Sequence, residues 1–153
     1  TSILFFALFW CGLIVAAPLL SCHQMTLSSG MIYYFYSKIC HQIPERSFMV
    51  CEKPFAVCAR CTGIYTGFLI GLLLFPMIIF VKKDFHLSRK FFLIMIIPLI
   101  IDVLISLTGF WQNTFLSRYI TGLILGSVTA LLVVPGIYYF YKKTEENHGF
   151  KTG

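Results

Sequence analysis

The chain has 153 residues, of which 58% are hydrophobic and only 12% are charged, and its mean hydropathy is +0.84. A soluble domain carries about 45–50% apolar and about 25% charged residues, and one of this size leaves about a third of its surface in water. The composition therefore excludes a soluble globular enzyme and a disordered chain. It indicates an all-α integral membrane protein, because lipid offers no partner for free backbone groups.

The net charge of +6 comes from 12 Lys and Arg against 6 Asp and Glu. Many of the basic residues flank apolar runs, in the 82–90 connector and in the tail after residue 141. Basic residues in such positions are topology signals of a membrane protein. We therefore expect no nucleic-acid partner. The expected partners are the lipid bilayer and other membrane protein subunits.

Four apolar runs approach the roughly 20 helical residues that a bilayer core requires. They are residues 3–20, 63–81, 91–107 and 119–141. We predict a single membrane domain over residues 1–153, folded as a four-transmembrane-helix bundle with a Cys/His-rich segment at 21–62. The first run ends in Leu19–Cys22, which loosely resembles a lipoprotein cleavage site, but we expect a retained span.

The distribution of positive charge predicts the orientation of these spans. The 82–90 connector and the tail after 141 hold seven Lys or Arg residues, whereas segments 21–62 and 108–118 hold five. Positive residues prefer the cytoplasmic side of a membrane. We therefore predict a protein of a prokaryotic cytoplasmic (inner) membrane, with both termini in the cytoplasm and the Cys/His-rich segment outside.

Small residues repeat every four positions on the second and fourth predicted spans. The rows are Gly63, Gly67 and Gly71 on one span and Gly122, Gly126 and Ala130 on the other. Small residues allow helix backbones to approach closely inside lipid, where apolar burial gives little drive for association. We expect these two rows to face each other.

One carboxylate, Asp102, lies within the third predicted span. A charge at that depth costs at least about 2.5 kcal/mol on insertion scales, so it requires a partner or a role. Arg118, at the outer end of the fourth span, is the expected partner in a structural ion pair. The alternative is a polar site shared with the Cys/His-rich segment, which contributes Arg46 and Arg60.

Five of the six cysteines and two of the four histidines lie in segment 21–62. They are Cys22, His23, Cys40, His41, Cys51, Cys58 and Cys61. Zinc sites use four Cys or His ligands, with one pair often two residues apart, as in Cys58-x-x-Cys61. Cys40, His41 or both would continue such a site, and Cys22, His23 or Cys51 would supply a remaining ligand.

Two other uses of these cysteines stay open. Arg60 lies between Cys58 and Cys61, and a helix is predicted directly after them; both features favour a reactive thiolate. Thiol–disulfide exchange is therefore one alternative. Inert disulfides are the other, because they are expected in an oxidising compartment.

Two separated blocks, Cys40–Phe48 and Cys58–Gly67, resemble the uncharacterised prokaryotic membrane proteins grouped as domain of unknown function 2085. Asp102 and the stretch Arg118–Gly126 also fit that pattern, so the resemblance covers about residues 30–130. It implies a small multi-span bundle without an established activity. It also implies a recurrent set of Cys40, His41, Cys58 and Cys61. Three thiols cannot all form pairs, whereas three thiols and an imidazole can hold one metal ion.

We therefore predict an accessory or scaffold subunit with a zinc-like site at the outer membrane boundary. The alternative is a quinone-linked thiol–disulfide oxidoreductase, by architectural analogy with bacterial disulfide-generating proteins of four spans. It would use Cys58 and Cys61 as the reactive pair, Cys40 and Cys51 as a shuttle pair, and an apolar pocket beside them for quinone. Transport past Asp102 is a weaker alternative, because polar residues are scarce on the inner half of the spans.

Overall fold

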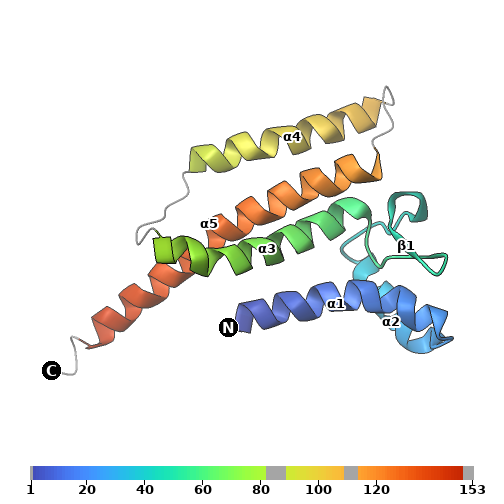
Figure 1. Cartoon of the computed structure of the whole chain (residues 1–153), viewed down its shortest axis with the longest axis horizontal. Helices are drawn as coiled ribbons and strands as arrows, with labels where there is room; N and C mark the ends of the chain where they lie inside the picture. The colour runs from blue at the N-terminus through green and yellow to red at the C-terminus, as the bar shows by residue number, and fades with distance from the viewer. Residues whose placement is uncertain (1, 82–88, 109–113, 150–153) are drawn as a thin grey trace.

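The structure, a computed structural model, describes residues 2–81, 89–108 and 114–149 (Figure 1). Within these residues the chain is mostly helical, as the composition predicted. Its elements are α1 (Ser2–Cys22), α2 (Thr26–Ser37), a short 3₁₀ helix (Pro44–Arg46), β1 (Met49–Val50), β2 (Lys53–Pro54), α3 (Ala59–Val81), α4 (Arg89–Thr108) and α5 (Phe115–Gly149).

Within the described residues, three helical stretches are long and apolar enough to cross a membrane. They are Ser2–Cys22, Ala59–Ile78 and Phe115–Tyr138, and they overlap the first, second and fourth predicted spans. The third predicted span, 91–107, is helical within α4, whose described apolar stretch is the shorter Leu93–Ile105. Most of the predicted 82–90 connector and the middle of the 108–118 connector lie outside the described residues.

Large apolar side chains are exposed along the spanning helices and α4. Phe5 is 74% exposed, Leu93 63% and Leu116 66%. Soluble monomers rarely expose apolar surface over such extended areas. Such exposure is expected for the apolar helices of a membrane protein, whose outward side chains face lipid.

Helices α3 and α5 run side by side in the same direction (Figure 1) and form the closest helix contact. A side-chain carbon at Gly67 would lie 2.2 Å from the Leu123 carbonyl oxygen, and one at Gly126 would lie 2.0 Å from the Ile64 carbonyl oxygen. A side-chain carbon at Gly63, Gly71 or Gly122 would likewise lie less than 3.0 Å from an atom of the facing helix. The two small-residue rows therefore bring the backbones together, and the Ser127 hydroxyl donates to the Gly67 carbonyl at 3.0 Å.

Helix α2 folds back against α1 rather than continuing it. The chain reverses at Gln24, whose φ is 58°. The Ser29 hydroxyl then donates to the Ala17 carbonyl at 2.8 Å, and the Tyr36 hydroxyl donates to the Trp10 carbonyl at 2.8 Å. Tyr36 is fully buried, and these bonds hold α2 in place because each buried hydroxyl has a partner.

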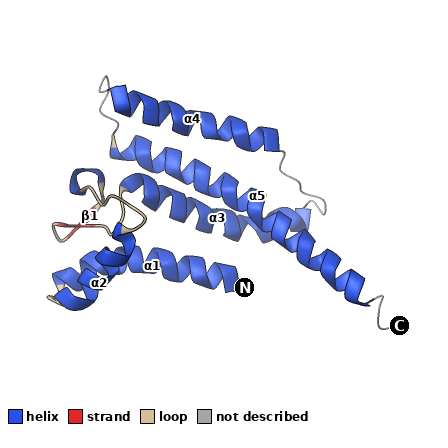
Figure 2. Cartoon of the chain, turned by 180° about the vertical axis from the view of Figure 1, so that it is seen from behind, coloured by secondary structure: helices blue, strands red, loops and turns tan. Residues whose placement is uncertain are grey.

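A short hairpin follows α2 and the 3₁₀ helix. Strands β1 and β2 pair antiparallel, and the turn residues Cys51 and Glu52 both have positive φ, at 49° and 60°. Such a turn matches the twist of a two-residue hairpin. Phe48, just before β1, packs on Tyr119 of α5 with ring centroids 5.6 Å apart. The hairpin therefore lies at the end of the molecule where α3 and α5 begin (Figure 2).

Candidate metal centre and polar site

Three cysteine sulfur atoms converge at the beginning of α3. The Sγ atoms of Cys40, Cys58 and Cys61 all lie within 4.8 Å of one another, and none of the three forms a disulfide. Cys58 and Cys61 are close because they are three residues apart at the start of a helix, where the Cys58 carbonyl accepts the first helical hydrogen bond, from Thr62. Cys40 reaches them from the loop after α2. We call these residues the three-thiol cluster.

The loop that carries Cys40 is held by side chains that bond to the backbone. The Gln42 amide donates to the carbonyls of Tyr33 and Ala56, each at 2.8 Å, and the Tyr33 hydroxyl donates to the Pro54 carbonyl. Gln42 has a φ of 50°, which turns the chain sharply after Cys40. These bonds join α2 to the segment before α3 and so place the Cys40 sulfur beside Cys58.

The surroundings of Cys40 favour its thiolate form. The Cys58 and Cys61 thiols donate hydrogen bonds to its sulfur and, with the Cys58 backbone N–H at 3.3 Å, lower the pKa of Cys40 well below its usual range. Burial opposes this effect but is the smaller influence. The thiolate is the form of cysteine that binds metals and attacks disulfides. The cluster is therefore prepared for either chemistry.

The other predicted ligands lie elsewhere. His41 is exposed although Cys40 beside it is buried, and the structure does not bring it into the three-thiol cluster. The reason is that adjacent residues point in different directions outside a helix. Cys22 and Cys51 lie next to each other instead, at the end of α1 and the hairpin turn. Cys51 is therefore the neighbour of Cys22, and not a member of the cluster with Cys40.

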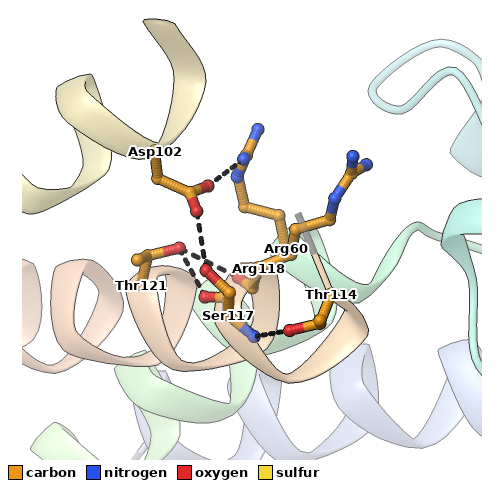
Figure 3. A network of polar contacts seen from close by, with 6 residues as sticks. All are labelled: Arg60, Asp102, Thr114, Ser117, Arg118 and Thr121. Atoms are coloured by element: carbon orange, nitrogen blue, oxygen red, sulfur yellow. Dashed lines mark hydrogen bonds and ion pairs between the residues drawn. The ribbon is translucent and has the colours of Figure 1, made fainter. Parts of the chain in front are cut away.

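A polar network joins α4 to α3 and α5 near the same end of the molecule. Asp102 forms an ion pair with Arg60, and the Ser117 hydroxyl donates to Asp102 Oδ1 at 2.8 Å (Figure 3). Asp102 is only 7% exposed. A buried carboxylate is tolerated when it is paired and hydrogen-bonded. This network gives α4 a polar attachment to the other two helices.

The sequence predicted an ion pair between Asp102 and Arg118, whereas the ion pair that the structure shows for Asp102 is with Arg60; Arg118 is a charged neighbour of Asp102. Arg60 was missed as a partner because it belongs to α3, which is distant in the chain from α4 and α5. The charge of Arg118 is influenced by four charged or titratable groups, which are Arg46, Arg60, Asp102 and the Cys58 thiol. Arg60, Asp102 and Arg118 therefore lie together (Figure 3), and Arg46 and Cys58 are near enough to act on the charge of Arg118.

An apolar cavity of about 320 Å³ lies between α1, α3 and α5. Its ten lining residues are Ile3, Phe6, Ala7, Trp10, Cys11, Ile64, Tyr65, Phe68, Gly126 and Thr129. Tyr65 connects the cavity to the cluster, because it lies one helical turn after Cys61 and packs in the same apolar core as the three cysteines. The Trp10 ring packs on Tyr65 with centroids 5.8 Å apart, and its buried indole nitrogen has no hydrogen-bond partner within the described residues.

Sequence reasoning missed the residues that organise this region. Gln42 lies inside the Cys40–Phe48 block. Its position directly after the candidate ligands Cys40 and His41 is the sequence feature that could have indicated a supporting role. Ser117 precedes Arg118, but it is uncharged, so the sequence does not identify it as a partner of Asp102. Trp10 and Tyr65 are aromatic residues within apolar runs, where nothing local distinguishes a cavity wall from a lipid-facing side chain.

The comparisons with known proteins find one family and uncharacterised archaeal relatives. The model of the family "Predicted membrane protein (DUF2085)" matches residues 40–132. An uncharacterised protein of Methanocaldococcus jannaschii is 41% identical over 116 residues, which cover 73% of this chain and 72% of that protein. An uncharacterised protein of Methanothermobacter thermautotrophicus is 35% identical over 102 residues, 67% of this chain and 90% of its own length. No solved structure matches the chain.

Proposed function

We propose that this chain, which belongs to the DUF2085 family of predicted membrane proteins, holds one metal ion of the zinc type in its three-thiol cluster. The observation that carries the proposal is the convergence of three unpaired cysteine sulfurs within 4.8 Å, two from α3 and one from a loop 18 residues earlier. Three thiols so close together cannot all be consumed by disulfides with one another.

The geometry of the cluster suits a tetrahedral ion. Zinc binds thiolates at about 2.3 Å, which separates neighbouring sulfurs by about 3.8 Å, and all three sulfurs lie within 4.8 Å of one another, at most about 1 Å beyond that spacing. Three thiolates and a divalent ion leave one negative charge. Arg118 neighbours Cys58, and the positive end of the α3 dipole lies at Cys58 and Cys61; both stabilise that charge.

The type of ligand, thiolate, supports a structural role rather than hydrolytic catalysis, and the three thiols leave the fourth position of a tetrahedral ion to one further ligand. Thiolate-rich sites are typical of structural zinc, whereas catalytic zinc is usually held mainly by histidine and carboxylate. The ion would fasten the loop after α2 to the beginning of α3. We propose that the protein is an accessory or scaffold subunit of a membrane assembly, with lipid and other membrane proteins around its exposed apolar faces.

Metal analysis of the protein purified without chelator or reductant tests the proposal. We expect about one equivalent of zinc or another soft metal in the full chain, and its loss in Cys58→Ser and Cys61→Ser. Cys51→Ser is the matched control, because it removes an exposed thiol outside the cluster. A metal-free wild-type protein, or equal metal contents in Cys58→Ser and Cys51→Ser, would overturn the assignment.

We further propose four spans, formed by α1, α3, α4 and α5, with both termini in the cytoplasm and the cluster outside a prokaryotic cytoplasmic membrane. The support is the excess of Lys and Arg in the 82–90 connector and the C-terminal tail. A membrane-impermeant maleimide should label the exposed Cys51 in intact cells. Labelling of Cys51 only after the cells are broken would show that the orientation is the opposite of the one proposed.

A second candidate function is thiol oxidation linked to a membrane quinone, and the apolar cavity favours it. The cavity is lined by residues of the three stretches that are long and apolar enough to cross a membrane, and one of them, Tyr65, packs in the same core as the cluster. In this reaction the Cys58 and Cys61 thiols would lose two electrons and two protons as their disulfide forms. The quinone would accept both electrons and both protons and become the quinol.

A reduction assay separates the two functions. Protein reduced by dithiothreitol and freed of excess reductant should convert a soluble quinone to quinol with loss of two thiols, and Cys58→Ser should abolish this. Cys51→Ser should leave the reaction unchanged. Metal bound to the wild type together with quinone reduction that persists in Cys58→Ser would eliminate the redox function and leave the metal site.

A further inference from the structure

Two arginines lie beside one buried carboxylate where α3 and α5 begin, and a third arginine comes from the segment that packs on the start of α5. Arg46 comes from the 3₁₀ helix, Arg60 from the first turn of α3 and Arg118 from the first turn of α5. Figure 3 shows the guanidinium groups of Arg60 and Arg118 on the side of α5 that faces Asp102. Arg46 lies near them because Phe48, two residues later, packs on Phe115 and Tyr119 at the start of α5, and its charge acts on Arg118.

The positive charge of this arginine cluster exceeds the negative charge beside it. The negative charge of Asp102 offsets the positive charge of one arginine. A three-thiol cluster that holds a divalent ion would carry one negative charge and would offset one more. Glu45 is exposed and, in the described part of the chain, forms no ion pair. Like charges in partly buried surroundings repel one another strongly, so this arrangement favours an anion between them.

The chemistry of the site identifies the kind of anion. Asp102 holds one terminal nitrogen of Arg60, whereas the buried Arg60 Nε has no hydrogen-bond partner within the described residues. Guanidinium groups present parallel N–H donors that match phosphate oxygens. The cluster also lies at the ends of two spanning stretches, which is the depth of lipid headgroups.

We propose that Arg46, Arg60 and Arg118 bind a phosphate group at the membrane boundary, with Asp102 orienting Arg60. The group is either inorganic phosphate or the phosphate of an anionic phospholipid. The site does not depend on metal in the three-thiol cluster, so its test is independent of that proposal.

Arg46→Gln is the principal variant, because Arg46 is exposed and its loss should not disturb folding. Lys38→Gln is the matched control: it removes the same charge from an exposed lysine at the end of α2. Calorimetry on the detergent-purified full chain measures inorganic phosphate binding, with chloride replaced so that ionic strength is constant. We expect Arg46→Gln to weaken binding about tenfold, the value of one charge-assisted hydrogen bond, and Lys38→Gln to have no effect.

A second arm distinguishes the two sources of phosphate. Melting temperatures are measured in phosphatidylcholine nanodiscs with and without phosphatidic acid. Stabilisation by phosphatidic acid in the wild type and Lys38→Gln, but not in Arg46→Gln, would identify a lipid headgroup. Binding of inorganic phosphate that depends on Arg46 would identify the free anion. If Arg46→Gln and Lys38→Gln respond alike in both arms, the proposed site does not exist.

Discussion

Replacing Gly126 by alanine should separate the backbones of α3 and α5. The added carbon would lie 2.0 Å from the Ile64 carbonyl oxygen and 2.8 Å from the Phe68 nitrogen. Both neighbours are backbone atoms, so no flexible side chain can move aside. The helices must move apart by about 1 Å or more before that contact becomes acceptable.

The expected cost follows from the loss of this contact. Overfilling a packed interface destabilises a protein by about 1–3 kcal/mol, and separation also weakens the Ser127 hydrogen bond to the Gly67 carbonyl. Gly136→Ala is the matched control on the same helix, because an added carbon there meets nothing within 4 Å. Alanine favours a helix over glycine by up to about 1 kcal/mol. We therefore expect Gly136→Ala to be neutral or slightly stabilising, and Gly126→Ala to be about 2 kcal/mol less stable than it.

Unfolding in mixed micelles of increasing denaturing detergent, followed by circular dichroism, measures the difference. The free energies of unfolding of the two variants are compared in the same lipid and detergent mixture. Equal stabilities for Gly126→Ala and Gly136→Ala would show that the close approach of α3 and α5 does not exist in the membrane protein.

Further predictions concern the metal ligands, the polar network around Asp102 and the buried Tyr36 hydroxyl. His41→Ala should keep about one equivalent of metal in elemental analysis, because His41 is exposed outside the cluster; loss of the ion would make it the fourth ligand. Asp102→Asn should lower the free energy of unfolding by about 2 kcal/mol or more, since the Arg60 charge loses its partner, whereas Ser117→Ala should cost about 1 kcal/mol. Burial raises the pKa of Tyr36 above its usual value, so the folded state holds this proton more tightly and stability should fall above about pH 10. Tyr36→Phe should lessen that fall and lower stability near neutral pH by about 1 kcal/mol, and an unchanged pH profile would contradict this.

Features that depend on short-range patterns could be predicted from the sequence. Apolar runs identify the helices, because hydrocarbon requires long apolar segments. The four-residue spacing of Gly63, Gly67 and Gly71 marks a helix face that backbones can approach, and the structure places α5 against it. The Cys58-x-x-Cys61 spacing likewise places two sulfurs together at a helix start, whatever the rest of the chain does.

Features that depend on the path of the long connector could not be predicted. Cys51 and Glu52 make a tight turn with positive φ although neither is glycine, so the chain carries no obvious turn signal there. That turn places Cys51 beside Cys22, so Cys51 does not lie beside Cys40, which belongs to the three-thiol cluster. The choice between Cys40 and His41 depends on the Gln42 hydrogen bonds, which join segments 14 residues apart. Arg60 meets Asp102 across 42 residues of chain.

The Gln42 amide has a thermodynamic consequence for the three-thiol cluster. Its two bonds, to the carbonyls of Tyr33 and Ala56, position Cys40 by protein contacts alone. In a classical zinc finger the peptide folds only with the ion, and the binding energy pays for that folding. Here the three sulfurs already lie close together, so the proposed ion would add to existing contacts and would enter or leave without unfolding the helices. The fraction of protein loaded should therefore follow the free metal concentration around the membrane, while the helical content stays constant.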